Sequence, residues 1–338
     1  MRRAAVASSL VLLSVVASAC SGAATTSGFN TGDGGLGNGG NGGEAGTLGG
    51  DGGSGGNGTV SVIYAHTDTE LYVMDPTSHA VTDLGPFQVG GQSGGRSPSG
   101  PVTDLAVNSA GAVYVNTETA IYKAAVPASP GPVSLTLQTT LAVKSGQRFY
   151  ALAFATAGVL GSGEGLVAGD NKGELWYVDT STSNATPQDL GGFGSNPAGD
   201  PWELSGDLVF YTNGGAPTGL ATIRSCPSGS CGTSNDSLAA IDMNALAQAF
   251  SAKAPGNLLK GTYGGGTGYG DLFGLGAWGN KAYGFARAQS GGSPAALVEI
   301  DGTTGAGTSL QQFPSITKGW SGAGVTTAAI ITVPAPAK

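Results

Sequence analysis

Three acidic residues stand at the start of short apolar segments that are typical of β-strands. Asp104 precedes residues 105–107, Glu203 lies within residues 202–204, and Asp271 precedes residues 272–275. If these segments are equivalent strands of one repeated unit, the three carboxylates could converge on a single site. Calcium is the metal that fits such a site, because it prefers several oxygen ligands and can add backbone carbonyls to carboxylates. The sequence indicates no other cofactor.

The same three acids have a structural alternative, in which they accept hydrogen bonds from local backbone amides or face solvent. The position that aligns with Asp104 in the following unit is Ala151, which breaks any complete ring of ligands. The two histidines, His66 and His79, have no cluster of carboxylates nearby in the sequence, so they do not indicate a zinc site or a catalytic triad. We therefore predict no catalytic residue.

A five-residue pattern recurs along the chain and organises the segments that position these acids. The copies begin at Leu71, Ile121, Leu175, Leu238 and Leu297, at steps of 50, 54, 63 and 59 residues. Such a period is the signature of a repeat architecture. Four copies end in aspartate, and an aspartate between a strand and a turn fixes the turn by accepting hydrogen bonds from amides that follow. These aspartates are Asp75, Asp179, Asp242 and Asp301.

Each copy of the pattern is accompanied by other short apolar segments bounded by Gly, Asn, Asp or Pro. The segments read as four strands per unit, and four strands in such a unit match a blade of a β-propeller. We predict an all-β chain with a propeller over residues 59–333. Five blades fit best, and six are possible if residues 253–270 contain further strands. Residues 243–250 predict either one or two helical turns or a strand followed by a polar loop.

The ends of the predicted propeller complement each other. The first unit, which begins at residues 60–64, has only three strands, whereas residues 319–325 resemble an innermost strand without partners. Pairing the C-terminal segment with the first unit would bring Val325 close to Ile63 and complete a blade. Such closure removes exposed sheet edges, which otherwise invite aggregation.

The units resemble a large superfamily of bacterial propeller blades that read approximately Leu-Tyr-x-Ile-Asp, a Thr-Gly turn, and a Leu-Gly strand. The resemblance is clearest at residues 71–85, 175–191 and 302–305. It implies the fold over about residues 60–330, but it implies no activity, because propellers have unrelated functions. Trp202 and Trp320, near the starts of inner strands, are candidates for stacking on a ligand, and packing in the core is the alternative.

The N-terminus predicts export. Residues 1–20 combine two arginines, an apolar run and small residues, as a signal peptide does, and residues 4–19 are shorter than the roughly 20 needed to span a bilayer. Residues 17–20 resemble a bacterial lipobox, which implies lipidation of Cys20; the alternative is a soluble exported protein cut after Ala19. Cys20 is followed by Ser21 rather than by aspartate, and in this the sequence resembles lipoproteins that are sorted to an outer membrane. We therefore predict a lipid-anchored protein of the bacterial cell envelope.

The segment after the predicted lipidation site is a predicted tether. Residues 21–58 contain 18 glycines among 38 residues. Such a segment offers too little apolar surface to fold, so we expect a flexible chain. The two remaining cysteines, Cys226 and Cys231, are separated by Pro-Ser-Gly-Ser and predict a local disulfide in an exported protein.

The composition excludes one class of partner and leaves two functional hypotheses. Only 11% of the residues are charged and the net charge is −8, so a surface that neutralises the phosphates of nucleic acid is not expected. Our leading hypothesis is a non-enzymatic scaffold that binds a protein or carbohydrate at the cell surface, with the lipid anchor as its only contact with the membrane. The alternative is a metal-dependent hydrolase or lyase that resembles extracellular lactonases, which need a nearly complete ring of ligands.

Overall fold

The computed structural model describes residues 62–90, 97–227, 231, 235–287 and 293–329. The predicted signal peptide with Cys20, the predicted tether 21–58 and both ends of the predicted 59–333 domain lie outside these residues. The regular secondary structure of the described chain is β-strand, apart from one α-helix, α1 (Met243–Ala252). In the described residues, no helix is long and apolar enough to cross a membrane.

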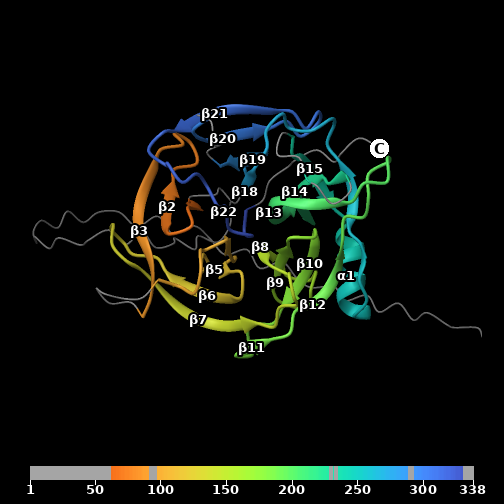
Figure 1. Ribbon diagram of the computed structural model, residues 1–338, viewed down its shortest axis with the longest axis horizontal. Helices are drawn as coiled ribbons and strands as arrows, with labels where there is room; N and C mark the ends of the chain where they lie inside the picture. The colour runs from red at the N-terminus through yellow and green to blue at the C-terminus, as the bar shows by residue number, and fades with distance from the viewer. Residues whose placement is uncertain (1–61, 91–96, 228–230, 232–234, 288–292, 330–338) are drawn as a thin grey trace, which may run out of the picture. The chain divides into compact units, whose positions relative to one another are not determined.

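The strands form four sheets (Figure 1). The first sheet runs in the order β22-β1-β2-β3-β7-β6-β5-β4, with β11 paired to β7. Its strands are β1 (Ile63–His66), β2 (Glu70–Met74), β3 (Val81–Val89), β4 (Asp104–Val107), β5 (Val113–Thr117), β6 (Ala120–Ala125), β7 (Val133–Leu141), β11 (Asn184–Ala185) and β22 (Gly322–Gly324). Because β3 and β7 pair in parallel, two four-stranded antiparallel sections are joined at their outer edges.

The other three sheets follow in chain order. The second sheet contains β8 (Phe149–Ala155), β9 (Gly165–Asp170), β10 (Glu174–Val178), β12 (Gln188–Gly192) and β16 (Gly256–Asn257). The third contains β13 (Trp202–Asn213), β14 (Ala216–Ser225), β15 (Ser237–Ile241) and β17 (Leu259–Thr262). The fourth contains β18 (Leu272–Trp278), β19 (Lys281–Ala286), β20 (Ala295–Ile300) and β21 (Gly307–Phe313).

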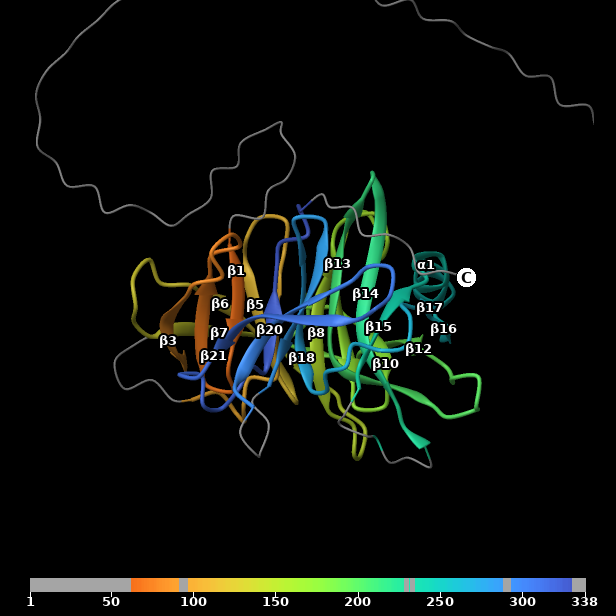
Figure 2. The ribbon, with the colours of Figure 1, turned by 90° about the horizontal axis from the view of Figure 1, so that it is seen from above.

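The innermost strands form a closed ring. Within the unit 46–338, β22 contacts β4, β4 contacts β8, β8 contacts β13, β13 contacts β18, and β18 contacts β22. Figure 1 looks down this ring, and Figure 2 shows strands such as β13 and β14 running between its two faces. The predicted pairing of the two ends of the domain is confirmed, because β22 pairs with β1 and places Gly324 opposite Tyr64.

Close contact between the inner strands requires residues without side chains. A Cβ atom at Gly206 in β13 would overlap the carbonyl group of Leu272 in β18. A Cβ atom at Gly322 in β22 would overlap the side chains of Asp104 and His66. Glycine therefore sets the distance between neighbouring strands at the centre of the ring.

The recurring aspartates have the predicted structural role. In the turn after β2, Asp75 Oδ1 accepts hydrogen bonds from the amides of Thr77 and Ser78 at 3.0 and 2.7 Å. Asp179 and Asp301 make equivalent bonds in their own turns. Asp242 instead caps α1 by accepting from the first amides of the helix, as an N-cap residue does.

The third sheet departs from the predicted strands. Residues 202–204 and 208–211 belong to one strand, β13, which is interrupted by an irregularity between Leu204 and Leu208. The next strand, β14, was not predicted, because Pro217 and Gly219 disrupt its apolar pattern; its pairing with two neighbours overrides that local preference. Residues 253–270 do contain two strands, β16 and β17. They do not form a further sheet, because β16 joins the second sheet and β17 joins the third.

Candidate functional site

A pocket of about 370 Å³ lies over the centre of the ring, where the inner strands begin. Every inner strand contributes a residue from its N-terminal end or from immediately before it. The pocket is lined by Asp68, Pro101, Val102, Thr103, Glu118, Tyr150, Leu204, Ser205, Gly206, Arg224, Phe273, Arg287 and Ser321. Its volume is in the range of pockets that bind small ligands or chemical groups of larger ones.

Three inner strands are irregular at the pocket. The pairing of β8 with β9 skips Tyr150, and the pairing of β18 with β19 skips Phe273. In β13, the pairing with β14 skips residues 205–207. A bulge takes a residue out of the regular alternation and redirects its side chain. As a result, Tyr150, Phe273 and Ser205 all line the pocket.

Directly below this level, two buried carboxyl groups join the inner strands. Asp104 in β4 accepts a hydrogen bond from the amide of Leu152 in β8 at 2.6 Å. Asp207 in β13 accepts from the amide of Leu275 in β18 at 2.8 Å. The innermost strands are sheet edges, so their amides have no ladder partner on the side of the axis. The aspartates supply acceptors to these amides and thereby stabilise the closed ring.

The carboxyl groups of Asp104 and Asp207 are close enough for each to influence the titration of the other. Burial, together with the charge of Asp207, raises the pKa of Asp104 well above its ordinary value, and burial raises the pKa of Asp207 to about 7. Two adjacent buried carboxylates repel each other, so the pair retains a proton at neutral pH.

Two further titratable groups are buried close to the centre. Asp236 accepts a hydrogen bond from the amide of Leu272 at 2.8 Å, and burial raises its pKa to about 6. The Nε2 atom of His66 lies 3.9 Å from Asp104 Oδ1, and burial lowers the pKa of His66 to about 4. The imidazole is therefore neutral at neutral pH, and it is not exposed to solvent.

The charged residues that line the pocket are paired unequally. Glu118 accepts a hydrogen bond at 3.2 Å from Arg148, which lies outside the pocket lining. In contrast, Arg224 is 3.7 Å from Asp271 and Arg287 is 3.6 Å from Asp68, both beyond a normal hydrogen bond. The Nε atom of Arg224 is buried and has no hydrogen-bond partner among the described residues.

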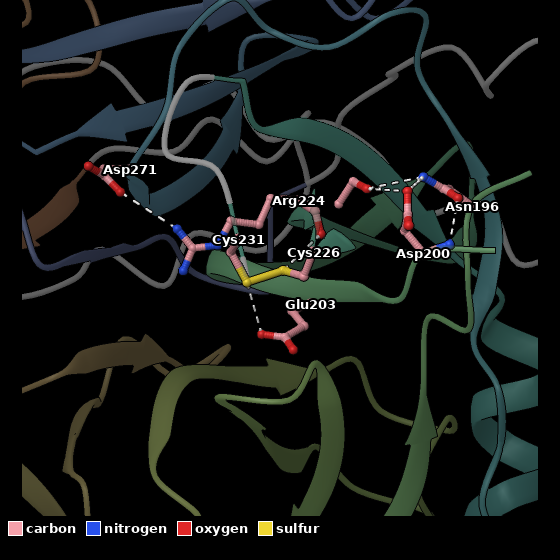
Figure 3. Close-up of a disulfide and its surroundings, with 8 residues drawn as sticks. Asn196, Asp200, Glu203, Arg224, Cys226, Cys231 and Asp271 are labelled. Carbon is pink, nitrogen blue, oxygen red and sulfur yellow. Dashed lines mark hydrogen bonds and ion pairs between the residues drawn. A yellow bond between two sulfur atoms is a disulfide. The ribbon is translucent and has the colours of Figure 1, made fainter. Parts of the chain in front are cut away.

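A disulfide stands beside Arg224 (Figure 3). The predicted bond between Cys226 and Cys231 is confirmed. Glu203 Oε2 lies 3.2 Å from the sulfur of Cys231, and these three residues are the one group in the described chain whose atoms are spaced closely enough to share a metal ion. In the disulfide, both sulfurs are bonded to each other and are not thiolate ligands.

The three acids predicted to bind calcium are not brought together as one group of ligands in the described structure. Asp104 is buried at the axis, Glu203 faces the disulfide, and Asp271 faces Arg224. Calcium binding itself stays a prediction. Asp271 has a positive φ of 55°, a conformation that aspartate tolerates better than most residues.

The two tryptophans proposed for ligand stacking lie in different surroundings. Trp320 is fully buried and contacts Tyr72, Phe285 and Phe313 edge to face. Trp202 is half-buried and packs against the core formed by the second and third sheets. Neither residue lines the pocket. The aromatic residues that do so are Tyr150 and Phe273.

Several residues of this site were missed in the sequence. Asp207 follows Ser205-Gly206, which reads as a turn between two strands, and Arg224 lies on the strand β14 that was not predicted. The sequence does not show that Tyr150 and Phe273 face the pocket, because the bulges that turn them there depend on pairing with β9 and β19. One usable signal was the equivalent position of these two aromatic residues, each the second residue of its inner strand.

No family model matches the sequence, and no curated protein matches it. Solved structures do show similarity. A Bacteroides caccae protein of unknown function has a TM-score of 0.44 at 8% identity, over 79% of this chain and 99% of the other. The Dos1 propeller has a TM-score of 0.34 at 14% identity, over 76% and 57%. A chain of the COPII coat assembled on membranes has a TM-score of 0.40 at 12% identity, over 75% and 32%.

Proposed function

We propose that this chain is a five-bladed β-propeller that acts as a non-enzymatic binding scaffold, and that its partner contacts the face with the central pocket. The observation that carries this proposal is the set of three bulges at the pocket, in β8, β13 and β18. Bulges interrupt pairing and are frequent next to functional sites. Here they present side chains to a solvent-accessible pocket, while the acids below are bonded to the backbone of the ring.

The blade count of five is supported by the five inner strands that contact one another in succession. In this arrangement the first blade consists of β22, β1, β2 and β3, and the second of β4, β5, β6 and β7. The remaining three sheets each supply one blade.

We test the binding face by site-specific photocrosslinking of the full chain in its native cells. A photoreactive phenylalanine analogue replaces Tyr150, which is 39% exposed at the pocket, or Leu310, which is 38% exposed on β21. The proposal predicts a discrete crosslinked adduct from position 150 and none from position 310. Equal adducts at both positions, or none at position 150, would refute it.

We further propose that the protein is exported and anchored in the bacterial cell envelope, at the outer membrane, through a lipid on Cys20. The support is the sequence of residues 1–58 alone. Metabolic labelling with a fatty acid should mark the wild-type chain and not the Cys20→Ser variant. Equal labelling of both chains would rule out this anchor.

A further inference from the structure

The pocket contains hydrogen-bond donors without acceptors. A guanidinium group carries several N–H donors in a planar fork and no acceptor. Among the described residues, no hydrogen bond joins the side chain of Arg224 or Arg287 to a protein acceptor, and their aspartate neighbours lie 3.7 and 3.6 Å away. The buried Nε of Arg224 has lost contact with water as well. An unsatisfied buried donor is costly, so these groups favour an acceptor from a ligand.

The charge balance limits the ligand to a small negative charge. Arg224 and Arg287 are offset by Asp271 and Asp68, and Glu118 is offset by Arg148, so these six side chains together are neutral. A single carboxylate leaves the site with one negative charge, whereas a phosphate carries more. The net charge of −8 on the chain adds to the repulsion of polyanions. A planar carboxylate also matches the fork of a guanidinium group.

The aromatic and apolar residues of the pocket fit a cyclic group on the ligand. Tyr150 and Phe273 occupy equivalent bulges in β8 and β18 and both line the pocket. The guanidinium of Arg287 lies over the ring of Phe273, 5.5 Å from its centroid, so a cation and an aromatic surface stand together. Val102 and Leu204 add apolar contacts.

From these features we infer that the central pocket recognises a single carboxylate attached to a ring with an apolar face. Arg224 and Arg287 bind the carboxylate, and Tyr150 and Phe273 contact the ring. Aromatic acids and uronic acids share this chemistry. The inference rests on the proposed binding function and names the group that the partner inserts.

The test is isothermal titration calorimetry of the full chain with matched pairs of probes. Phenylacetate is compared with phenylacetamide, which keeps the ring and removes the charge, and glucuronate is compared with glucose. Acetate and inorganic phosphate test the carboxylate without a ring and the higher charge. We expect one acid of the two pairs to bind at least tenfold more tightly than its neutral counterpart, and more tightly than acetate or phosphate. The pair that responds distinguishes an aromatic acid from a sugar acid.

Variants locate the binding site. Arg224→Gln and Arg287→Gln should each weaken the preferred acid at least tenfold, and Phe273→Ala should weaken it severalfold. Lys281→Gln is the matched control, because Lys281 forms an exposed ion pair with Glu299 and does not line the pocket. This variant should bind the preferred acid with the same affinity as the wild type. If an arginine variant does not fold, the comparison of acid with neutral probe on the wild-type chain still decides the question.

Three results would overturn the inference: neither acid exceeds its neutral counterpart, phosphate binds most tightly, or folded arginine variants bind like the wild type. Failure of the inference is distinguishable from failure of the proposed function. If the acids do not bind but position 150 still crosslinks to a partner, the carboxylate assignment is wrong and the binding face stands. If position 150 gives no adduct either, both are wrong.

Discussion

Two polar layers lie at the centre of the ring, and their hydrogen bonds distinguish them. In the lower layer, Asp104 and Asp207 accept from amides of neighbouring inner strands at 2.6 and 2.8 Å. In the pocket above, Arg224 and Arg287 remain beyond hydrogen-bond distance of their nearest carboxylates. Ionisable residues in neighbouring layers of one fold can therefore either hold the fold together or stay free for a ligand. The number of acceptors or donors that each group satisfies within the protein decides which.

The largest expected effect follows removal of a carboxylate from the lower layer. Asp207→Ala leaves the buried amides of Leu208 and Leu275 without their acceptor. Each orphaned group costs about 1–3 kcal/mol, so we expect the free energy of unfolding to fall by about 3 kcal/mol or more. Urea denaturation at pH 5 measures it. Asp207→Asn, which keeps one carbonyl oxygen, should lose less, and an alanine variant within about 1 kcal/mol of the wild type would contradict the role of Asp207.

The lower layer should also make stability depend on pH. The pKa of Asp104 is raised, and the pKa values of Asp207 and Asp236 are raised to about 7 and about 6. Between about pH 4 and 7 these acids hold protons that the unfolded chain has released, so their contribution to stability is lost as the pH rises through this window. The pKa of His66, lowered to about 4, acts in the opposite direction between pH 4 and 6.5.

Three acids oppose one histidine, so the free energy of unfolding should fall by a few kcal/mol from about pH 5 to pH 8, since one pKa unit corresponds to about 1.4 kcal/mol. Below pH 4 stability should fall again, because hydrogen bonds in their turns lower the pKa values of Asp75, Asp179 and Asp301. Urea midpoints measured across this range check the profile. A maximum at pH 7 or above would show that the buried acids are ionised without cost.

The disulfide beside the pocket should have a smaller effect. Its sequence separation is 5, and closing so short a loop stabilises a protein by about 2 kcal/mol in the chain-entropy model. Replacing both Cys226 and Cys231 with serine should lower the free energy of unfolding by about that amount in urea. Since Glu203 and Arg224 lie beside the disulfide (Figure 3), weaker binding of the preferred acid should accompany the loss. A variant with unchanged stability and affinity would show that the loop contributes to neither.

The smallest expected change in stability belongs to the exposed aspartates of the turns. Asp301→Ala removes the acceptor for the amides of Thr303 and Thr304, at 2.9 and 2.6 Å. Both amides are exposed and can bond to water instead, so we expect the free energy of unfolding to fall far less than it does in Asp207→Ala. Urea denaturation of Asp301→Ala and Asp207→Ala under the same conditions compares the two losses in the free energy of unfolding. A loss at Asp301 as large as that at Asp207 would show that burial does not separate the two kinds of aspartate.

The sequence predicts the architecture better than the site. The recurring pattern marks one middle strand of each unit, and the turn aspartates and the pairing of β22 with β1 follow from it. The pocket depends on features that no local pattern contains. Bulges in β8 and β18 arise from pairing with the next strand, and they decide that Tyr150 and Phe273 face the pocket. Asp207 was missed because Ser205-Gly206 reads as a turn rather than as part of one long strand.

The most direct test of this division between the layers compares two variants in one urea denaturation experiment at pH 5. We predict that the double variant Arg224→Gln/Arg287→Gln keeps the free energy of unfolding of the wild type to within about 0.5 kcal/mol. Asp207→Ala should lose about 3 kcal/mol or more under the same conditions. If the double arginine variant is destabilised as much as Asp207→Ala, the arginines hold the ring together and are not free for a ligand.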